Sequence, residues 1–77
     1  MPTLLLKNGF RFFFYANEHL PKHIHITKGD DFAKYDLERD VFVNNYFSAN
    51  ETNVIIEIIK ENKSLFLEKW YEYFNKR

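Results

Sequence analysis

The chain has 77 residues, with eleven basic and eleven acidic side chains, so its formal net charge is zero. That balance disfavours a protein that binds nucleic acid through general electrostatic attraction, and leaves a local basic patch for such a role. The absence of cysteine excludes disulfides and thiolate metal sites, while nine Phe, five Tyr and one Trp supply much apolar area for a small core.

The first two strands are predicted around an Asn8-Gly9 turn. Leu4–Leu6 and residues 10–15 flank this pair, and Asn-Gly between apolar runs is typical of a tight hairpin because both residues tolerate a positive φ. One face of the second strand carries Phe10, Phe12 and Phe14, and the other carries Arg11, Phe13 and Tyr15. Both faces are largely apolar, so we expect a central strand with a helix on one face and a partner or ligand on the other.

Three more strands are expected after this hairpin. Residues 23–28 alternate His-Ile-His-Ile-Thr-Lys, as in a half-buried strand, and Gly29-Asp30-Asp31 forms the next turn. Residues 32–38 alternate again, and residues 41–46 form a fifth short strand. In residues 32–38 we expect Ala33, Tyr35 and Leu37 to face inward, and Lys34, Asp36 and Glu38 to face outward into water.

A helical segment is predicted from Ser48 onward. Ser48 and Glu51 have the spacing of a capping box, in which the serine accepts a hydrogen bond from the third helical amide. A stripe with helical spacing follows, made of Ile55, Ile58, Ile59, Asn62, Phe66, Trp70, Tyr73 and Phe74. Because Asn62 interrupts this apolar stripe, we favour two helices with a break near residues 62–64 over a single long helix.

These elements predict an α+β fold, an antiparallel meander of four to five strands followed by one or two C-terminal helices packed on one sheet face. We expect a single domain over residues 1–77, with the sheet in residues 1–46 and the helical part in residues 48–76. No apolar run reaches the length of a membrane span and no signal peptide is recognisable. We therefore expect a cytoplasmic protein without membrane contact.

The most informative residues are three histidines within seven positions, His19, His23 and His25, and the chain has no others. On a strand, His23 and His25 point to the same face because side chains alternate. Two such imidazoles can share one Zn²⁺ ion, with His19 brought back as a third ligand by the loop at Pro21, and with Glu18 or water completing the set. The first interpretation is therefore a zinc site formed by His19, His23 and His25.

Catalysis is the second interpretation, because a ribonuclease can use one histidine as the base and another as the acid, which makes His23 and His25 catalytic candidates. Nearby cations that could hold a phosphate are Arg11, Lys22, Lys28 and Lys34, whereas Glu18, Asp30 and Asp31 would repel an RNA backbone. The simplest interpretation is that the histidines form the polar, solvated or partner-facing side of a half-buried strand.

The strand face that carries Arg11, Phe13 and Tyr15 is expected beside the His23–His25 face, by the order of the meander. A mixture of Arg, Tyr, Phe and His suits a protein interface or a nucleotide site better than plain solvent. We therefore predict a binding surface made of Arg11, Tyr15, Glu18, His19, His23 and His25.

Five segments carry a resemblance to a known family: Met1-Pro2-Thr3, residues 9–15, residues 18–25, Gly29-Asp30 with Ala33-Lys34, and residues 70–74. Together they resemble the small bacterial family called domain of unknown function 4160, over nearly the whole chain, and the Glu-His…His-x-His run is the most specific part. The resemblance implies no established activity. Family members resemble one half of two-gene toxin–antitoxin-like modules, which implies a protein partner and a bacterial cytoplasm.

Two hypotheses of function follow from these residues. The leading hypothesis is a partner-binding component of a toxin–antitoxin-type module, whose partner is the product of the adjacent gene or another copy of the chain. The alternative is a histidine- or metal-dependent ribonuclease acting on RNA, with nucleic acid as the partner. Zinc is the only cofactor that the histidines suggest, and the sequence leaves open whether any cofactor is bound.

Overall fold

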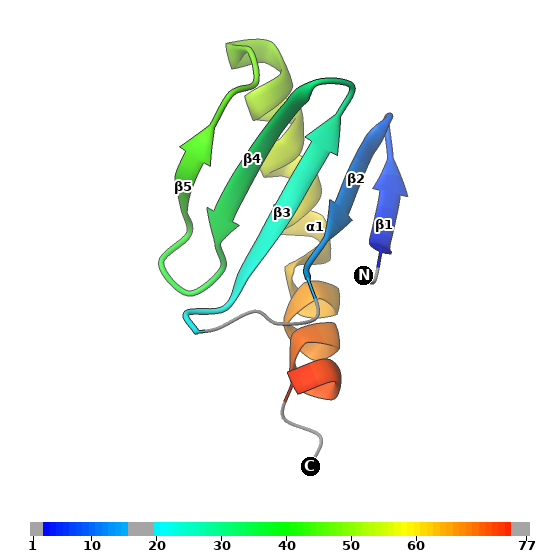
Figure 1. Cartoon of the computed structure of the whole chain (residues 1–77), viewed down its shortest axis with the longest axis vertical. Helices are drawn as coiled ribbons and strands as arrows, with labels where there is room; N and C mark the ends of the chain where they lie inside the picture. The colour runs from blue at the N-terminus through cyan, green and yellow to red at the C-terminus, as the bar shows by residue number, and fades with distance from the viewer. Residues whose placement is uncertain (1–2, 16–19, 75–77) are drawn as a thin grey trace.

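The computed structural model describes residues 3–15 and 20–74, which form an antiparallel sheet and one helix (Figure 1). The elements in chain order are β1 (Thr3–Lys7), β2 (Phe10–Phe13), β3 (His23–Lys28), β4 (Asp31–Asp36), β5 (Val41–Asn45) and α1 (Ala49–Phe74). The strands lie in the order β1-β2-β3-β4-β5, and every neighbouring pair is antiparallel. The predicted α+β meander is confirmed, with five strands and a single helix.

The tight turns have the backbone geometry that their sequences predict. Asn8 and Gly9 have φ values of 55° and 82°, so both central residues of the first hairpin turn lie in the left-handed region. Gly29 has a φ of 61° in the turn between β3 and β4. A Cβ added to Gly9 would lie 3.2 Å from Cε of Lys28, so the first turn also packs closely against the end of β3.

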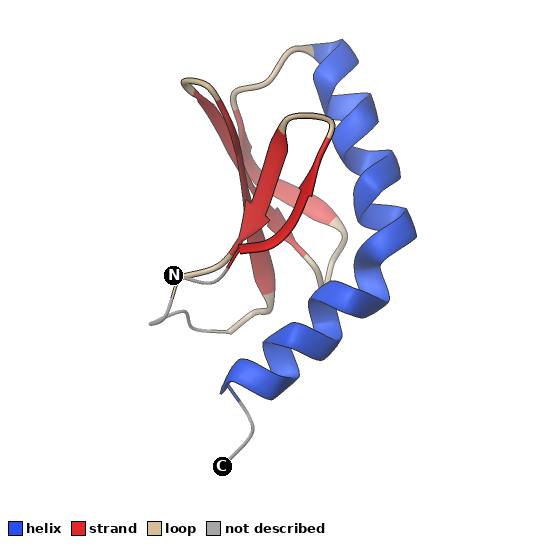
Figure 2. Ribbon diagram, turned by 90° about the vertical axis from the view of Figure 1, so that its right-hand side faces the viewer, coloured by secondary structure: helices blue, strands red, loops and turns tan. Residues whose placement is uncertain are grey.

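The hydrophobic core lies between α1 and one face of the sheet (Figure 2). Phe12 of β2 stacks on Phe66 of α1 with ring centroids 5.5 Å apart, and Phe14 meets Trp70 edge-on at 5.3 Å. Ile24 and Ile26 of β3 are fully buried on the same side. The helix buries five residues of the predicted stripe, Ile55, Ile58, Ile59, Phe66 and Trp70.

The helix begins as predicted at Ser48. The backbone N–H of Glu51 donates to Oγ of Ser48 at 3.2 Å, and the Ser48 hydroxyl donates to Oε1 of Glu51 at 3.4 Å. The favoured break near residues 62–64 is wrong, because α1 continues through it. Nδ2 of Asn62 donates to the carbonyl oxygen of Ile58 at 2.8 Å, so the polar side chain is satisfied inside the helix. The helix bends near its middle but is not interrupted (Figure 2).

The contact between Phe12 and Phe66 predicts a large effect of truncation. Replacing Phe12 by alanine leaves a cavity between β2 and α1, and we expect a loss of about 3–5 kcal/mol in the free energy of unfolding. Urea denaturation followed by circular dichroism measures it. The control is Leu6→Ala on the neighbouring strand, where the side chain is exposed and the expected change is below about 1 kcal/mol. Equal effects of the two substitutions would contradict this account of the core.

Candidate functional site

The sheet face opposite α1 holds most of the residues that the sequence singled out. In Figure 2 the helix lies on one side of the sheet only, and no helix or strand among the described residues covers the other side. We call the side chains on that side the open face. Its members include Arg11, Phe13, Tyr15, His25, Thr27, Phe32, Lys34, Val43 and Tyr46.

The register of β2 and β3 brings the predicted aromatic and histidine residues together. Phe13 pairs with His25 across the two strands, and their rings stack with centroids 5.5 Å apart. The ring of Tyr15 meets His25 at 4.8 Å, and Cζ of Arg11 lies 4.3 Å above the ring of Phe13. The shared face of Arg11, Phe13, Tyr15 and His25 is thus confirmed, while their use as a binding surface stays a prediction.

Phe13 is covered by its own neighbours. We expected this side of β2 to need a partner, yet the Phe13 side chain is buried. Its ring is covered by the guanidinium of Arg11 and by the rings of Tyr15 and His25. The outer layer of the open face is therefore formed by the surrounding side chains, above all Tyr15, and not by Phe13 itself.

His23 lies where the open face meets the end of the helix. Its ring is 5.2 Å from the ring of His25 and 5.2 Å from that of Trp70, and the residue is only 4% exposed. Nδ1 of His23 is 2.8 Å from the carbonyl oxygen of Pro21. His25 is half-buried, so a molecule arriving at the open face would meet His25 before His23.

Of the predicted zinc site, only His23 and His25 lie among the described residues. Glu18 and His19 lie outside the described residues. Within the described ranges, 3–15 and 20–74, no group of three or more His, Cys, Asp or Glu side chains could hold a metal ion. The rings of His23 and His25 are nearly perpendicular, at 85°. A zinc site of His19, His23 and His25 therefore stays a prediction that depends on where His19 lies.

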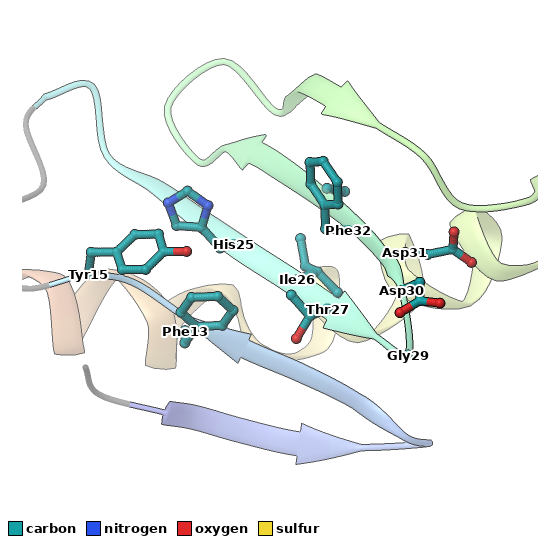
Figure 3. Close-up of a pocket in the computed structure, with 10 residues that line it drawn as sticks. Phe13, Tyr15, His25, Ile26, Thr27, Gly29, Asp30, Asp31 and Phe32 are labelled. Atoms are coloured by element: carbon teal, nitrogen blue, oxygen red, sulfur yellow. The ribbon is translucent and has the colours of Figure 1, made fainter.

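A hollow of about 370 Å³ opens on the open face beside His25 (Figure 3). The rings of Phe13, Tyr15 and His25 gather at one end of it, and Asp30 and Asp31 lie at the other end, at the turn between β3 and β4. Phe32 of β4 also lines the hollow, and its exposed ring packs against Tyr46 with centroids 4.7 Å apart. The hollow thus combines aromatic rings with two carboxylates.

Phe32 was not among the predicted site residues, although the sequence contained the signal. It shares the period of Lys34 and Asp36, which we assigned to the outward face of that strand. Tyr46 joins the open face through its contact with Phe32, and its backbone N–H donates to the carbonyl oxygen of Phe32 at 3.0 Å. Only the pairing of β4 with β5 places these two rings together.

A second hollow, of about 340 Å³, lies near the other end of β4, and His23, Lys34, Asp36, Arg39 and Val43 contribute to its wall. The prediction that Asp36 faces water is wrong, because the residue is fully buried. Oδ1 of Asp36 accepts hydrogen bonds from the backbone N–H of Glu38 at 2.8 Å and of Arg39 at 2.9 Å. Oδ2 accepts one from Nε of Arg39 at 3.1 Å. The carboxylate therefore organises the turn between β4 and β5.

These bonds lower the pKa of Asp36. The largest cause is the hydrogen bond from the Arg39 backbone; the Arg39 side chain and the Glu38 backbone act in the same direction, and burial partly opposes them. A carboxylate that accepts hydrogen bonds is favoured in its charged form.

A third hollow, of about 490 Å³, lies between β5 and α1, away from every predicted site residue. Nζ of Lys63 lies 2.7 Å from both carboxylate oxygens of Asp40, and the Tyr35 hydroxyl donates to Oδ1 of Asp40 at 3.4 Å. Burial, with the charge of Asp40, raises the pKa of Tyr35 above its ordinary value. These contacts fasten the turn between β4 and β5 to the helix.

Comparisons with known proteins add one finding. The family model described as Domain of unknown function (DUF4160) matches residues 9–71. This range includes β2, β3, β4, β5 and most of α1. No curated protein and no solved structure gives a significant match. Within the described residues, no helix is long and apolar enough to cross a membrane.

The lowered pKa of Asp36 predicts a pH-dependent contribution to stability. Because the folded pKa lies below the ordinary value of 3.8, the stabilisation is complete above that value and is lost as the pH falls through the folded pKa. Asp36→Asn keeps one acceptor oxygen but turns an N–H toward the Arg39 guanidinium. We expect the urea midpoint of the variant to lie below that of the unmodified chain at pH 7, and the difference to shrink at pH 3. A constant difference across this range would contradict the role given to the charge.

Proposed function

This chain belongs to the DUF4160 family, and we propose that it is the partner-binding component of a toxin–antitoxin-type module in the bacterial cytoplasm. The open face is its contact surface, and the partner is the protein encoded by the adjacent gene. The observation that supports this proposal is a sheet face rich in aromatic side chains over which no described element packs.

The composition of the open face favours a protein as the binding partner. Tyr15, Phe32, Val43 and Tyr46 are all exposed there, although each has a large apolar side chain. Exposed apolar groups that gather on one face are typical of interaction sites. Tyr and Arg are the side chains that most often dominate binding energy in protein interfaces, and Arg11 and Tyr15 flank the same Phe13 ring.

The ribonuclease alternative has less support from the contacts around the histidines. A base and an acid must both reach the substrate, yet His23 is buried against Trp70. Asp30 and Asp31 line the hollow beside His25 and would repel an RNA backbone. Lys34 of β4 pairs with His25 of β3, and its positive charge, by contrast, would favour a phosphate beside His25.

The proposal predicts that Tyr15→Ala weakens the complex with the adjacent-gene product. Tyr15 is 48% exposed on the open face, and its truncation should raise the Kd by about tenfold or more, as for an interface hot spot. The matched control is Tyr71→Ala, because Tyr71 is 62% exposed on α1 and we expect its truncation to leave the Kd within about twofold. Isothermal titration calorimetry measures both, and circular dichroism checks that both variants fold.

Three results would count against the proposal. The first is that the two proteins form no complex when co-expressed and purified. The second is that Tyr15→Ala and His25→Ala both bind like the unmodified chain, which would place the contact elsewhere. The third is RNA cleavage by the purified protein that disappears in a folded His25→Ala variant, which would favour the ribonuclease.

A further inference from the structure

We propose that the hollow beside His25 receives a cationic side chain, arginine above all, from a basic segment of the protein partner. The inference rests on the proposed function, because it specifies the chemistry of the partner at the same face. It is drawn from the rings that line the hollow, from the two carboxylates at its end and from a contact that the chain already makes with its own arginine.

The rings give the hollow an affinity for a flat cation. Phe13, Tyr15, His25 and Phe32 line it, and they come from the β2 end, from β3 and from β4 (Figure 3). A guanidinium is planar and weakly hydrated, so it stacks on aromatic rings better than an ammonium does. A volume of about 370 Å³ is at the lower end of the range of small-ligand pockets, so the hollow suits the side chains of a segment rather than a folded element.

The two carboxylates at the far end are not compensated within the described part of the chain. Asp30 and Asp31 make no side-chain hydrogen bond or ion pair there, and no lysine or arginine lines the hollow. Lys28, the nearest lysine in sequence, is directed elsewhere. Its Nζ lies 4.8 Å from the centre of the Phe10 ring and 3.5 Å from Oε2 of Glu51, on the side of the helix. Two negative charges at the turn end of a hollow whose other end is lined by aromatic rings are complementary to a cation (Figure 3).

Arg11 provides an intramolecular precedent for this contact. Its guanidinium carbon lies 4.3 Å from the centre of the Phe13 ring, on the same face, while its Nε donates to Oγ1 of Thr3 at 2.9 Å. Within the described residues, no cation lies over the ring of Phe32. The open face thus already stacks one guanidinium at the β1 side of the hollow and leaves the β4 side to an incoming one.

The charges along β4 also fix how the partner would lie. Asp31 begins β4 at the acidic end, whereas Lys34 lines the second hollow toward the other end, where Arg39 is already paired with Asp36. Lys34 is half-buried and has no ion pair within the described residues. A partner with a basic segment over Asp30 and Asp31 is therefore attracted in one orientation and repelled in the reverse one.

The test reverses the two charges at the turn and compares this with an equal reversal elsewhere. The variant is Asp30→Lys with Asp31→Lys, and the control is Glu57→Lys with Glu68→Lys, two exposed positions on α1 that change the net charge equally. Surface plasmon resonance against the adjacent-gene product should show about a tenfold or greater loss of affinity for the turn variant and a change within about twofold for the control. The loss should shrink as salt is added, because salt screens exposed charges.

A rescue experiment identifies the cation. Each arginine and lysine of the partner is replaced by glutamate in turn. One replacement should weaken binding to the unmodified chain and restore binding to the Asp30→Lys, Asp31→Lys variant. Asp30→Asn with Asp31→Asn should give an intermediate affinity, and circular dichroism confirms that each variant is folded.

The outcomes separate this inference from the proposed function. If Tyr15→Ala weakens the complex while the turn variant behaves like the control, the inference fails and the proposed function stands. If neither change matters, both fail. If the unmodified chain instead self-associates and the turn variant abolishes that association, the occupant is a second copy of this chain, and the assignment to a separate partner is overturned.

Discussion

A single helix can cover only one face of a five-stranded sheet, and most of this molecule follows from that constraint. Strand alternation sends every second side chain toward α1, where Phe12, Ile24 and Ile26 are fully buried. The remaining side chains of the same strands face away from the helix. In a chain this short, no further described element is present to bury them. The fold therefore leaves one sheet face without a covering helix as a consequence of completing its core.

The open face reduces that exposure with its own side chains. Phe13 is buried without a covering helix because Arg11, Tyr15 and His25 pack around it. Aromatic pairs at these distances stabilise one another beyond the area that they bury. The result is a preformed row of rings with Tyr15 outermost, and such a surface loses little conformational freedom on binding. This small entropy cost is a physical argument for the proposal that a partner binds this face rather than the exposed side of α1.

The parts of this structure that sequence could predict are those set by local pattern. The hairpin turn at Asn8-Gly9, the capping residue Ser48 and the buried stripe of α1 were all predicted, because each depends on neighbouring residues. Asn62 misled the prediction. Its polar side chain was taken as the sign of a helix break, whereas its side-chain amide donates a hydrogen bond to the carbonyl oxygen of Ile58, one turn earlier in the same helix. Asp36 was expected in water because it is charged, but the turn that follows it supplies hydrogen-bond donors that stabilise the buried carboxylate. The hollow beside His25 depends on register and on the turn joining β3 to β4, which alternation alone does not fix.

His23 and His25 have different surroundings, and this difference decides what a substitution at each position can show. His25 stacks within the open face, so its truncation chiefly alters that surface. His23 contacts both His25 and Trp70, and Trp70 belongs to the packing of Phe14 and Phe74 at the end of α1. A substitution at His23 therefore disturbs the core and the surface together, and any loss of binding that follows would have two explanations. The alternation that gives both residues the same strand face does not give them the same role. His25, with Tyr15 beside it, is the position at which binding can be separated from folding.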